Sequence, residues 1–458
     1  MKDRIIEYFE NHKHQLLGLI SELVEIPSVK GEAEEGKPFG PRPYEALCRA
    51  LEFADVFGFR TENCGGYVGT VDMGEGEPEL GILAHLDVVP AGDGWHTDPY
   101  KMTVDGDRIL GRGVSDDKGP AMCALFAMKA VKDMGIALSK NCRLILGTDE
   151  ECGSSDLKHY FRTAKPPKYT FTPAANFPVT NGEKGRFTKH FFADVDLSGD
   201  VKKLVSFNAG AAENVVPSFA EAYVSGIDEK EIKNAINLSK NTGADFAFEG
   251  GKIVCSGTSS HASLPEKGNN PITALIEMLS KIDFDKNSKK LISSLNVLFP
   301  HGKWNGEAFG VSMSDKLGAL TLSLDIVRFD GSKLEGCFDT RTPMCSTREN
   351  CALVIADRLE KHGFSIENTE MIKPHYVDEN SEFVQTLLSA YEEFSGDKGD
   401  CICMGGGTYV HDIDTGVAFG AISRDTQTNM HGADEFMPIN DLLTAAEIFT
   451  RVIINICK

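Results

Sequence analysis

The stretch GILAHLDVVP, residues 81–90, is an apolar run interrupted at two alternate positions by His85 and Asp87. In a β-strand, side chains two residues apart point to the same face, so these two polar groups would lie side by side. A buried histidine that pairs with a neighbouring acid for structural reasons is one explanation. A functional pair at the end of a strand is the other, and the segments around this stretch distinguish the two.

Predicted strands and helices alternate around residues 81–90. Apolar strands that alternate with helices are typical of a largely parallel sheet covered by helices on both faces. The first part of the chain is therefore predicted to be an α/β domain. Helices are predicted over 1–25, 44–58 and about 118–134, and strands over 66–72, 80–89, near 108–114, and 143–147.

The pattern changes after residue 178. Half-exposed antiparallel strands such as GALTLSLDIVRFDG, residues 318–331, alternate there with predicted helices. From residue 382 the α/β pattern resumes and ends in a helix at about 439–456. The prediction is one α/β domain, residues 1–178 and 382–458, interrupted by a large α+β domain, residues 179–381. The predicted helices of the insertion lie near 228–239, 271–282 and 347–362.

Composition limits the class of function. The 458 residues include 68 acidic and 47 basic side chains, which give a formal net charge of −21. Such a surface repels phosphate backbones and anionic lipids, so neither a nucleic acid nor a membrane is an expected partner. No stretch reaches the roughly 20 apolar residues that span a bilayer, and the N-terminal segment lacks a signal-peptide core. The twelve cysteines form no CxxC pair, and we expect a cytoplasmic protein with reduced thiols.

Polar side chains gather where the predicted strands end. In open α/β sheets, sites form beyond the carboxyl ends of the strands. Each group alone has a structural explanation, such as an acid that caps a helix. Together, at the edge of one sheet, they favour a functional site. The groups are His85 with Asp87, Asp116 with Asp117, Asp149 with Glu150 and Glu151, and His431.

Imidazoles and carboxylates without a thiol are a ligand set that suits Zn²⁺ and also Mn²⁺. A carboxylate can bridge two such ions. Asp87 has a natural role in orienting His85, because it can accept the proton of the second ring nitrogen. Of the adjacent Glu150 and Glu151, one can bind metal while the other transfers protons.

Eight segments, in this order, resemble the dinuclear zinc metallopeptidase family that contains PepV-type dipeptidases, carnosinases, aminoacylases and glutamate carboxypeptidases. They are AHLDVVP (84–90), GRGVSDDKGP (111–120), GTDEECGS (147–154), NVVP (214–217), SSHAS (259–263), DTRTP (339–343), GGGTY (405–409) and MHGADE (430–435). The long insertion is similar to that of PepV-type (Xaa-His or β-Ala-Xaa) dipeptidases. The resemblance implies that 179–381 is a lid domain and that the chain is a monomer.

The resemblance implies a role for each polar residue of the α/β domain. Two divalent ions, Zn²⁺ or Mn²⁺ in such relatives, would share Asp116 as a bridging ligand. His85 would complete the first site, and Glu151 with His431 the second. Glu150 would be the general base on a metal-bound water, Asp87 would orient His85, and the peptide bond after Asp116 would be cis.

The resemblance also assigns residues of the lid and of the glycine turn to the substrate. His261 would hydrogen-bond to the oxyanion of the tetrahedral intermediate. Asn214 and Arg341 would hold the substrate, and the planar fork of Arg341 suits a terminal carboxylate. An ordinary turn residue and a structural salt bridge are the alternatives for these two. The backbone N–H groups of Gly406, Gly407 and Thr408 would approach the same carboxylate.

Ala174 departs from the family pattern. It stands in FTPAANFPV, residues 171–179, where relatives carry an aspartate that completes the first metal site. A methyl group cannot bind a metal, so the first site keeps only His85 and the shared Asp116. The second site keeps three protein ligands, which are enough for Zn²⁺. Either Ala174 was introduced and disables an active peptidase, or it is natural, in a protein that works with one metal, uses a replacement ligand or no longer catalyses.

The expected function is a metal-dependent dipeptidase that hydrolyses short unblocked peptides. An N-acyl-amino-acid amidohydrolase on the same core is the alternative enzyme, and a free amine on the substrate separates the two. A catalytically impaired binder of amino acids or peptides is the alternative from another class. Rescue of hydrolysis by added Mn²⁺ or Zn²⁺ would exclude the binder.

Overall fold

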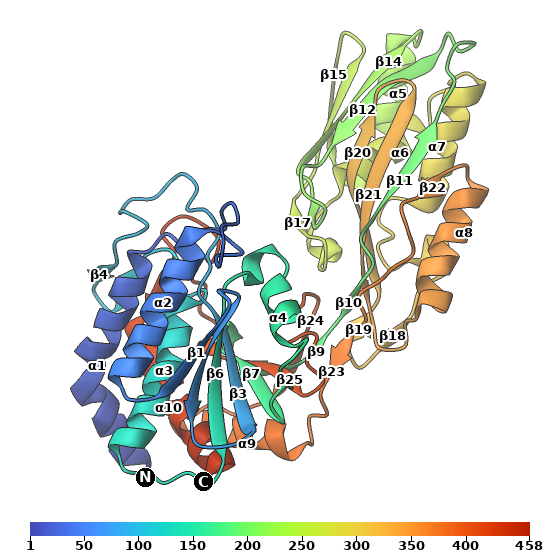
Figure 1. The fold of residues 1–458 in the computed structure, drawn as a ribbon. Coiled ribbons are helices and arrows are strands. Elements are labelled where there is room, and N and C mark those ends of the chain that lie inside the picture. The colour runs from blue at the N-terminus through green and yellow to red at the C-terminus, as the bar shows by residue number, and fades with distance from the viewer. The chain divides into compact units, whose positions relative to one another are not determined.

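The computed structural model describes residues 1–458, and internal contacts divide the chain into two units (Figure 1). The first unit comprises Met1–Gly182, Tyr376–Ile402 and Gly407–Lys458; the second comprises Glu183–His375 and Cys403–Gly406. Residues 403–406 group with the second unit because the Lys184 N–H donates to the Met404 carbonyl and Arg341 Nη1 donates to the Gly405 carbonyl. The insertion thus begins at 183 and ends at 375, against the predicted 179 and 381.

The large sheet of the first unit is parallel at its centre and antiparallel at its edges. The four central strands β6, β3, β7 and β25 are parallel. The expectation of a mostly parallel sheet is wrong at the edges, where a tight turn between β1 and β2 permits antiparallel pairing. The order is β1 (Arg60–Cys64), β2 (Val68–Met73), β6 (Asn141–Gly147), β3 (Pro78–His85), β7 (Tyr169–Thr172), β25 (Gly416–Phe419) and β9 (Val179–Glu183).

Both faces of this sheet are buried. Ile82 and Leu144 enter the larger hydrophobic core, whereas the adjacent Leu83 and Ile145 enter a smaller core on the opposite face. Helix α4 (Ser155–Tyr160) contributes to the smaller core. The larger core is formed with α1 (Lys2–Val24), α2 (Pro41–Val56), α3 (Lys118–Asp133), α9 (Glu382–Ser395) and α10 (Ile439–Cys457).

Two predicted strands of this unit end elsewhere than expected. Strand β3 ends at His85, so Asp87 lies in the loop that follows and not on the strand. The strand near 108–114 is only β5 (Arg108–Leu110), which pairs with β4 (Thr103–Asp105) and β27 (Phe436–Pro438) in a separate sheet. Gly111 and Gly113 have positive φ angles of 154° and 90° and end the strand there. Asp116 therefore does not follow a strand of the large sheet.

The second unit is an antiparallel sheet packed against helices over one hydrophobic core. Strand β14 alternates between exposed and buried residues, as expected of a half-exposed strand. Helices α5 (Glu229–Leu238), α6 (Pro271–Leu279) and α8 (Leu353–Lys361) form where predicted, and α7 (Lys286–Leu298) was not predicted. The sheet order is β15 (Asp245–Glu249), β16 (Lys252–Ser256), β14 (Phe219–Ser225), β12 (Lys203–Ala209), β20 (Thr321–Phe329), β21 (Lys333–Thr342), β11 (Lys189–Asp194) and β22 (Ser365–Ile366).

Short strands extend both sheets: β23 (His375–Tyr376) and β24 (Cys401–Met404) pair with β9, and β10 (Gly185–Arg186) pairs with β21. Other short strands form separate pairs. In the second unit, β13 (Val215–Val216) pairs with β17 (Ser260–His261), and β18 (Ser314–Asp315) pairs with β19 (Gly318–Ala319). In the first unit, β8 (Ala175–Asn176) pairs with β26 (Ala421–Ile422). No helix of the protein combines the length and the apolar character that crossing a bilayer requires.

Candidate metal centre and substrate-binding residues

The Asp116 carboxylate lies between two imidazoles in the first unit. His85 Nε2 is 3.1 Å from Asp116 Oδ1, and His431 Nε2 is 3.0 Å from Asp116 Oδ2. His85 comes from the end of β3, whereas His431 lies 315 residues after Asp116 in a loop before β27. One carboxylate with an imidazole at each oxygen is an arrangement that can bridge two cations.

Glu151 joins the same cluster. Its Oε1 is 3.2 Å from His431 Nε2, and one donor atom each from Asp116, Glu151 and His431 lie within 4.8 Å of one another. Glu151 Oε1 is buried and has no hydrogen-bond partner besides this contact with His431. A buried carboxylate is costly unless cationic groups compensate its charge. The three side chains therefore fit a divalent cation in both chemistry and geometry.

Asp87 holds two parts of the site from the loop after β3. Its backbone carbonyl is 3.1 Å from His85 Nδ1, and its Oδ1 is 3.5 Å from the same nitrogen. Its carboxylate accepts the backbone N–H groups of Glu150 and Glu151, at 3.2 and 3.1 Å. Asp87 thus fixes the imidazole of His85 and also the one-turn 3₁₀ helix Glu150–Cys152 that presents both glutamates.

The loop that carries Asp116 is held by a residue that the sequence reasoning missed. Glu435 is fully buried and pairs with Arg112 Nη1 at 2.6 Å. Its carboxylate also accepts the backbone N–H groups of Gly113, Ser115 and Asp116. The signal was available, because Glu435 ends the quoted segment MHGADE. The bond between Asp116 and Asp117 is cis, which confirms that expectation.

A second overlooked group supports the Glu150 side of the site. Asp156 is buried and accepts the N–H groups of Thr148 and Asp149, at 2.7 and 2.9 Å. The Tyr409 hydroxyl donates to the same carboxylate at 2.5 Å, and the Tyr409 ring packs edge-on against His85 with centroids 5.9 Å apart. Tyr409 ends the segment GGGTY, so this glycine turn also supports the metal centre.

Burial and mutual charge shift the pKa values of the site. Burial raises the pKa of Glu150 to about 7, against the attraction of His85, and the carboxylates of Asp116 and Glu151 add to the rise. Hydrogen bonds to Asp116 and Glu151 raise the pKa of His431 to about 10. Burial alone would lower the pKa of His85, but its bonds to Asp116 and Asp87 outweigh burial and raise it. The Glu150 carboxyl group therefore exchanges its proton closer to neutral pH than a free glutamate does.

Ala174 lies beyond the carboxyl end of β7, two residues past Thr172. Strand β7 is the parallel neighbour of β3, with Phe171 opposite Ile82, so the chain at 174 emerges at the same edge of the sheet as His85. Its N–H donates to Thr172 Oγ1 at 3.4 Å, and its side chain offers no metal ligand. His85 and Asp116 are the remaining donors on that side of the cluster.

In the second unit, the pairing of β13 with β17 brings Asn214 and His261 together. Val215 is opposite His261, and the Ala262 N–H donates to the Asn214 carbonyl at 2.9 Å. His261 Nδ1 accepts the backbone N–H of Ser263 at 3.1 Å. This bond requires an unprotonated Nδ1, so the neutral ring carries its proton on Nε2 and can donate from there. Burial, with Arg341 nearby, lowers the pKa of His261 and favours that neutral form.

Arg341 is already engaged in the second unit. Its Nε and Nη2 donate to the two oxygens of Asp339, at 2.6 and 3.0 Å, and its Nη1 donates to the Gly405 carbonyl at 2.8 Å. Asp339 thus occupies the fork that was expected to receive a terminal carboxylate. Any anion that Arg341 receives must use the guanidinium N–H groups that these bonds leave over.

The predicted site residues separate into two groups by unit. His85, Asp87, Asp116, Glu150, Glu151 and His431 come together in the first unit, and Asn214, His261 and Arg341 belong to the second. The glycine turn straddles a change of unit, because Gly406 groups with the second unit while Gly407 and Thr408 group with the first. A cavity of about 620 Å³ in the second unit is lined by Asn214 and Asp339 among others.

A model of peptidase family M20/M25/M40 matches residues 81–455. The Beta-Ala-Xaa dipeptidase of Lactobacillus delbrueckii subsp. lactis is 35% identical over 463 residues, covering 99% of this chain and 98% of that protein. Among solved structures, the aminoacylhistidine dipeptidase of Vibrio alginolyticus aligns at a TM-score of 0.60 and 14% identity, covering 97% of this chain and 96% of the other. Human carnosine dipeptidase 1 aligns at 0.59 and 15% identity, covering 99% and 98%. The two structural likenesses concern the fold.

Proposed function

Because this chain belongs to peptidase family M20/M25/M40, we propose that it is a metal-dependent dipeptidase that hydrolyses short unblocked peptides. The observation that carries the proposal is the convergence of Asp116, Glu151 and His431 on one point, with donor atoms within 4.8 Å of one another. The Lactobacillus relative, named a Beta-Ala-Xaa dipeptidase, supports a dipeptide substrate, since the identity of 35% extends over nearly the whole of both chains.

Asp116, Glu151 and His431 would hold one divalent cation, Zn²⁺ or Mn²⁺. His85 and Asp116 would form a weaker neighbouring site, because Ala174 supplies no ligand where relatives carry an aspartate. The chemistry supplied by a bound cation is polarisation of the scissile carbonyl and activation of a water. The metal ligands themselves are held by Asp87 and Glu435, so the site is organised before any substrate arrives.

Glu150 would transfer protons during hydrolysis. Its buried carboxyl group, whose pKa burial raises, would take a proton from the attacking water and return one to the leaving amine. Its position follows from Asp87, which accepts the Glu150 N–H and so fixes the start of the 3₁₀ turn. Glu151, the next residue, would bind the cation instead, because its side chain lies against that of His431.

Residues of the second unit would bind the substrate. His261 would donate from Nε2 to the oxyanion, as its Nδ1 already accepts the Ser263 N–H. Asn214, next to the strand that pairs with His261, would contact the substrate backbone. Arg341, oriented by Asp339, would attract the terminal carboxylate with the N–H groups that remain, together with the backbone N–H groups of the turn at 406–408. The insertion would then act as a lid that excludes water during the reaction.

The test compares a small dipeptide with its N-acetyl derivative, each assayed with added Mn²⁺ or Zn²⁺. We expect release of the amino-terminal residue from the free dipeptide and none from the acetylated compound. Hydrolysis of only the acetylated compound would replace the proposal with an N-acyl-amino-acid amidohydrolase. If neither compound is hydrolysed at any metal concentration, the proposal would be replaced by that of a non-catalytic peptide binder.

A further inference from the structure

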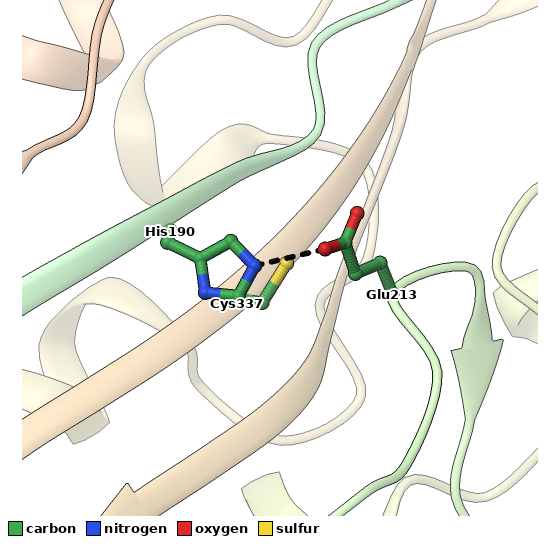
Figure 2. Close-up of side chains that lie close together, drawn as sticks. All are labelled: His190, Glu213 and Cys337. Carbon is green, nitrogen blue, oxygen red and sulfur yellow. Dashed lines mark hydrogen bonds and ion pairs between the residues drawn. The ribbon is translucent and has the colours of Figure 1, made fainter.

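A second cluster of potential metal ligands lies on the sheet of the second unit. His190 on β11 and Cys337 on β21 are direct partners in the antiparallel register, so their side chains lie on the same face. Phe191 and Phe338, the next residues, point to the opposite face and enter the hydrophobic core. Cys337 is thus buried on the polar side of the sheet, where Figure 2 shows it beside His190 and Glu213.

Three different donor atoms converge here. Glu213 Oε1 is 2.9 Å from His190 Nε2, and one atom each of His190, Glu213 and Cys337 lie within 4.8 Å of one another. The other ring nitrogen, Nδ1, is 2.7 Å from Glu335 Oε1. A carboxylate on one imidazole nitrogen, with ligands gathered at the other, is how proteins orient a metal-binding histidine.

The cluster is partly open to solvent. The Cys337 side chain is buried, whereas the Glu213 side chain is 58% exposed and that of His190 is 24% exposed. A cation can therefore enter past Glu213, and water can complete the coordination. Two glutamates beside one imidazole also leave the cluster with an excess of negative charge that a dication offsets.

We propose that His190, Glu213 and Cys337 bind a divalent cation of the Zn²⁺ class, with Glu335 as the positioning residue for His190. Sulfur with imidazole selects Zn²⁺ or Co²⁺ over Mn²⁺ and Mg²⁺. Binding releases the Cys337 thiol proton, and any second proton on His190, to solvent. The site would tie β11 and β21 to the turn at Glu213, next to Asn214. It does not depend on the proposed peptidase activity.

Titration of the full chain with Co²⁺ tests the site. A cobalt–thiolate bond gives a charge-transfer absorption. Because the cluster of Asp116, Glu151 and His431 contains no sulfur, Co²⁺ bound there does not produce this absorption. We expect one equivalent of the absorption per chain, lost in Cys337→Ser. Cys345→Ser, which removes an exposed cysteine of the same unit, should leave the absorption unchanged.

Variants of exposed side chains keep the test decisive if Cys337→Ser fails to fold. Loss of an outer carboxylate costs about 10–100-fold in metal affinity, so Glu335→Gln should weaken Co²⁺ binding by that factor, and Glu213→Gln by at least as much. The proposal is overturned if the wild type shows no cobalt–thiolate absorption, if the absorption persists in folded Cys337→Ser, or if Glu213→Gln reaches half of its cobalt–thiolate absorption at the same Co²⁺ concentration as the wild type. In that case His190 only bridges two glutamates.

Discussion

Ala174 is a residue whose replacement by aspartate should change the metal content of the chain. It emerges beside His85 at the carboxyl edge of the sheet, where a carboxylate would add a third donor to His85 and Asp116. We predict that Ala174→Asp raises the Mn²⁺ bound per chain and increases kcat for a dipeptide. Asn176→Asp, which adds the same charge two residues away, is the control and should do neither. Equal stoichiometry and equal activity in Ala174→Asp and the wild type would contradict the prediction.

Glu150 and Glu151 are adjacent but should respond differently to the same change. Glu150→Gln removes the proton acceptor and should lower kcat by about 10²–10⁴-fold while Mn²⁺ binding is retained. Glu151→Gln removes a ligand that contacts His431, so it should weaken Mn²⁺ binding. Steady-state kinetics and equilibrium dialysis on both variants separate the roles. Loss of Mn²⁺ in Glu150→Gln, with Mn²⁺ retained and kcat lowered in Glu151→Gln, would exchange the two roles.

Glu435 is predicted to stabilise the loop that carries Asp116. Glu435→Gln would leave the buried Arg112 without its charged partner, and breaking a buried pair costs about 3–5 kcal/mol. We expect the free energy of unfolding in urea to fall by that amount. Asp434→Asn is the matched control, because its partner His96 is exposed, and it should change stability little. A fall in stability of equal size in both variants would argue against a special role for Glu435.

At the scale of secondary structure, the sequence predicted the elements with strong periodicity. Strand β6 and helices α3 and α10 form within two residues of their predicted positions. The predicted ends of strands and helices were wrong where tertiary contacts determine at which residue an element stops. Asp87 leaves β3 yet still meets His85, because its carboxylate is held by the N–H groups of residues 150 and 151. Helix α7 was not predicted because its serines and asparagines favour turns locally. The packing of Leu291 and Leu295 in the hydrophobic core outweighs that preference.

Helix α10 carries a glutamate that should make stability depend on pH. Burial raises the pKa of Glu447 to about 7, Glu10 adds to the rise, and Lys2 opposes it. The folded state then binds more protons than the unfolded state between about pH 4.5 and 7, so the free energy of unfolding falls as pH rises through that range. The loss is at most about 3 kcal/mol, since one pKa unit corresponds to about 1.4 kcal/mol.

Glu447→Gln should remove this decline. We expect the variant to match the wild type near pH 4.5 and to exceed it in urea stability at pH 8. Glu10→Gln, which removes only the neighbouring charge, should give a smaller gain at pH 8. A Glu447→Gln variant that is less stable than the wild type at pH 8 would contradict the assignment.

At the scale of the whole molecule, the metal-binding candidates lie in the first unit with Asp87 and Glu150, whereas His261, Asn214 and Arg341 lie in the second. Predicted strand ends and the family resemblance suggested these residues, but could not reveal what holds them. Glu435 binds the loop before Asp116 through a pairing with Arg112 that spans 323 residues, and Asp156 meets Tyr409 across 253 residues. Such contacts follow from the tertiary fold and leave no periodic signal in the sequence.

The most direct test of the metal centre is equilibrium dialysis of the full chain against Mn²⁺, followed by elemental analysis. Mn²⁺ suits carboxylate and imidazole ligands and discriminates against the thiol-containing cluster at Cys337. We predict one tightly bound Mn²⁺ per chain in the wild type, and at least tenfold weaker binding in both Glu151→Gln and His431→Gln. A wild type that binds no Mn²⁺, or variants that bind it as tightly as the wild type, would contradict a metal centre at Asp116, Glu151 and His431.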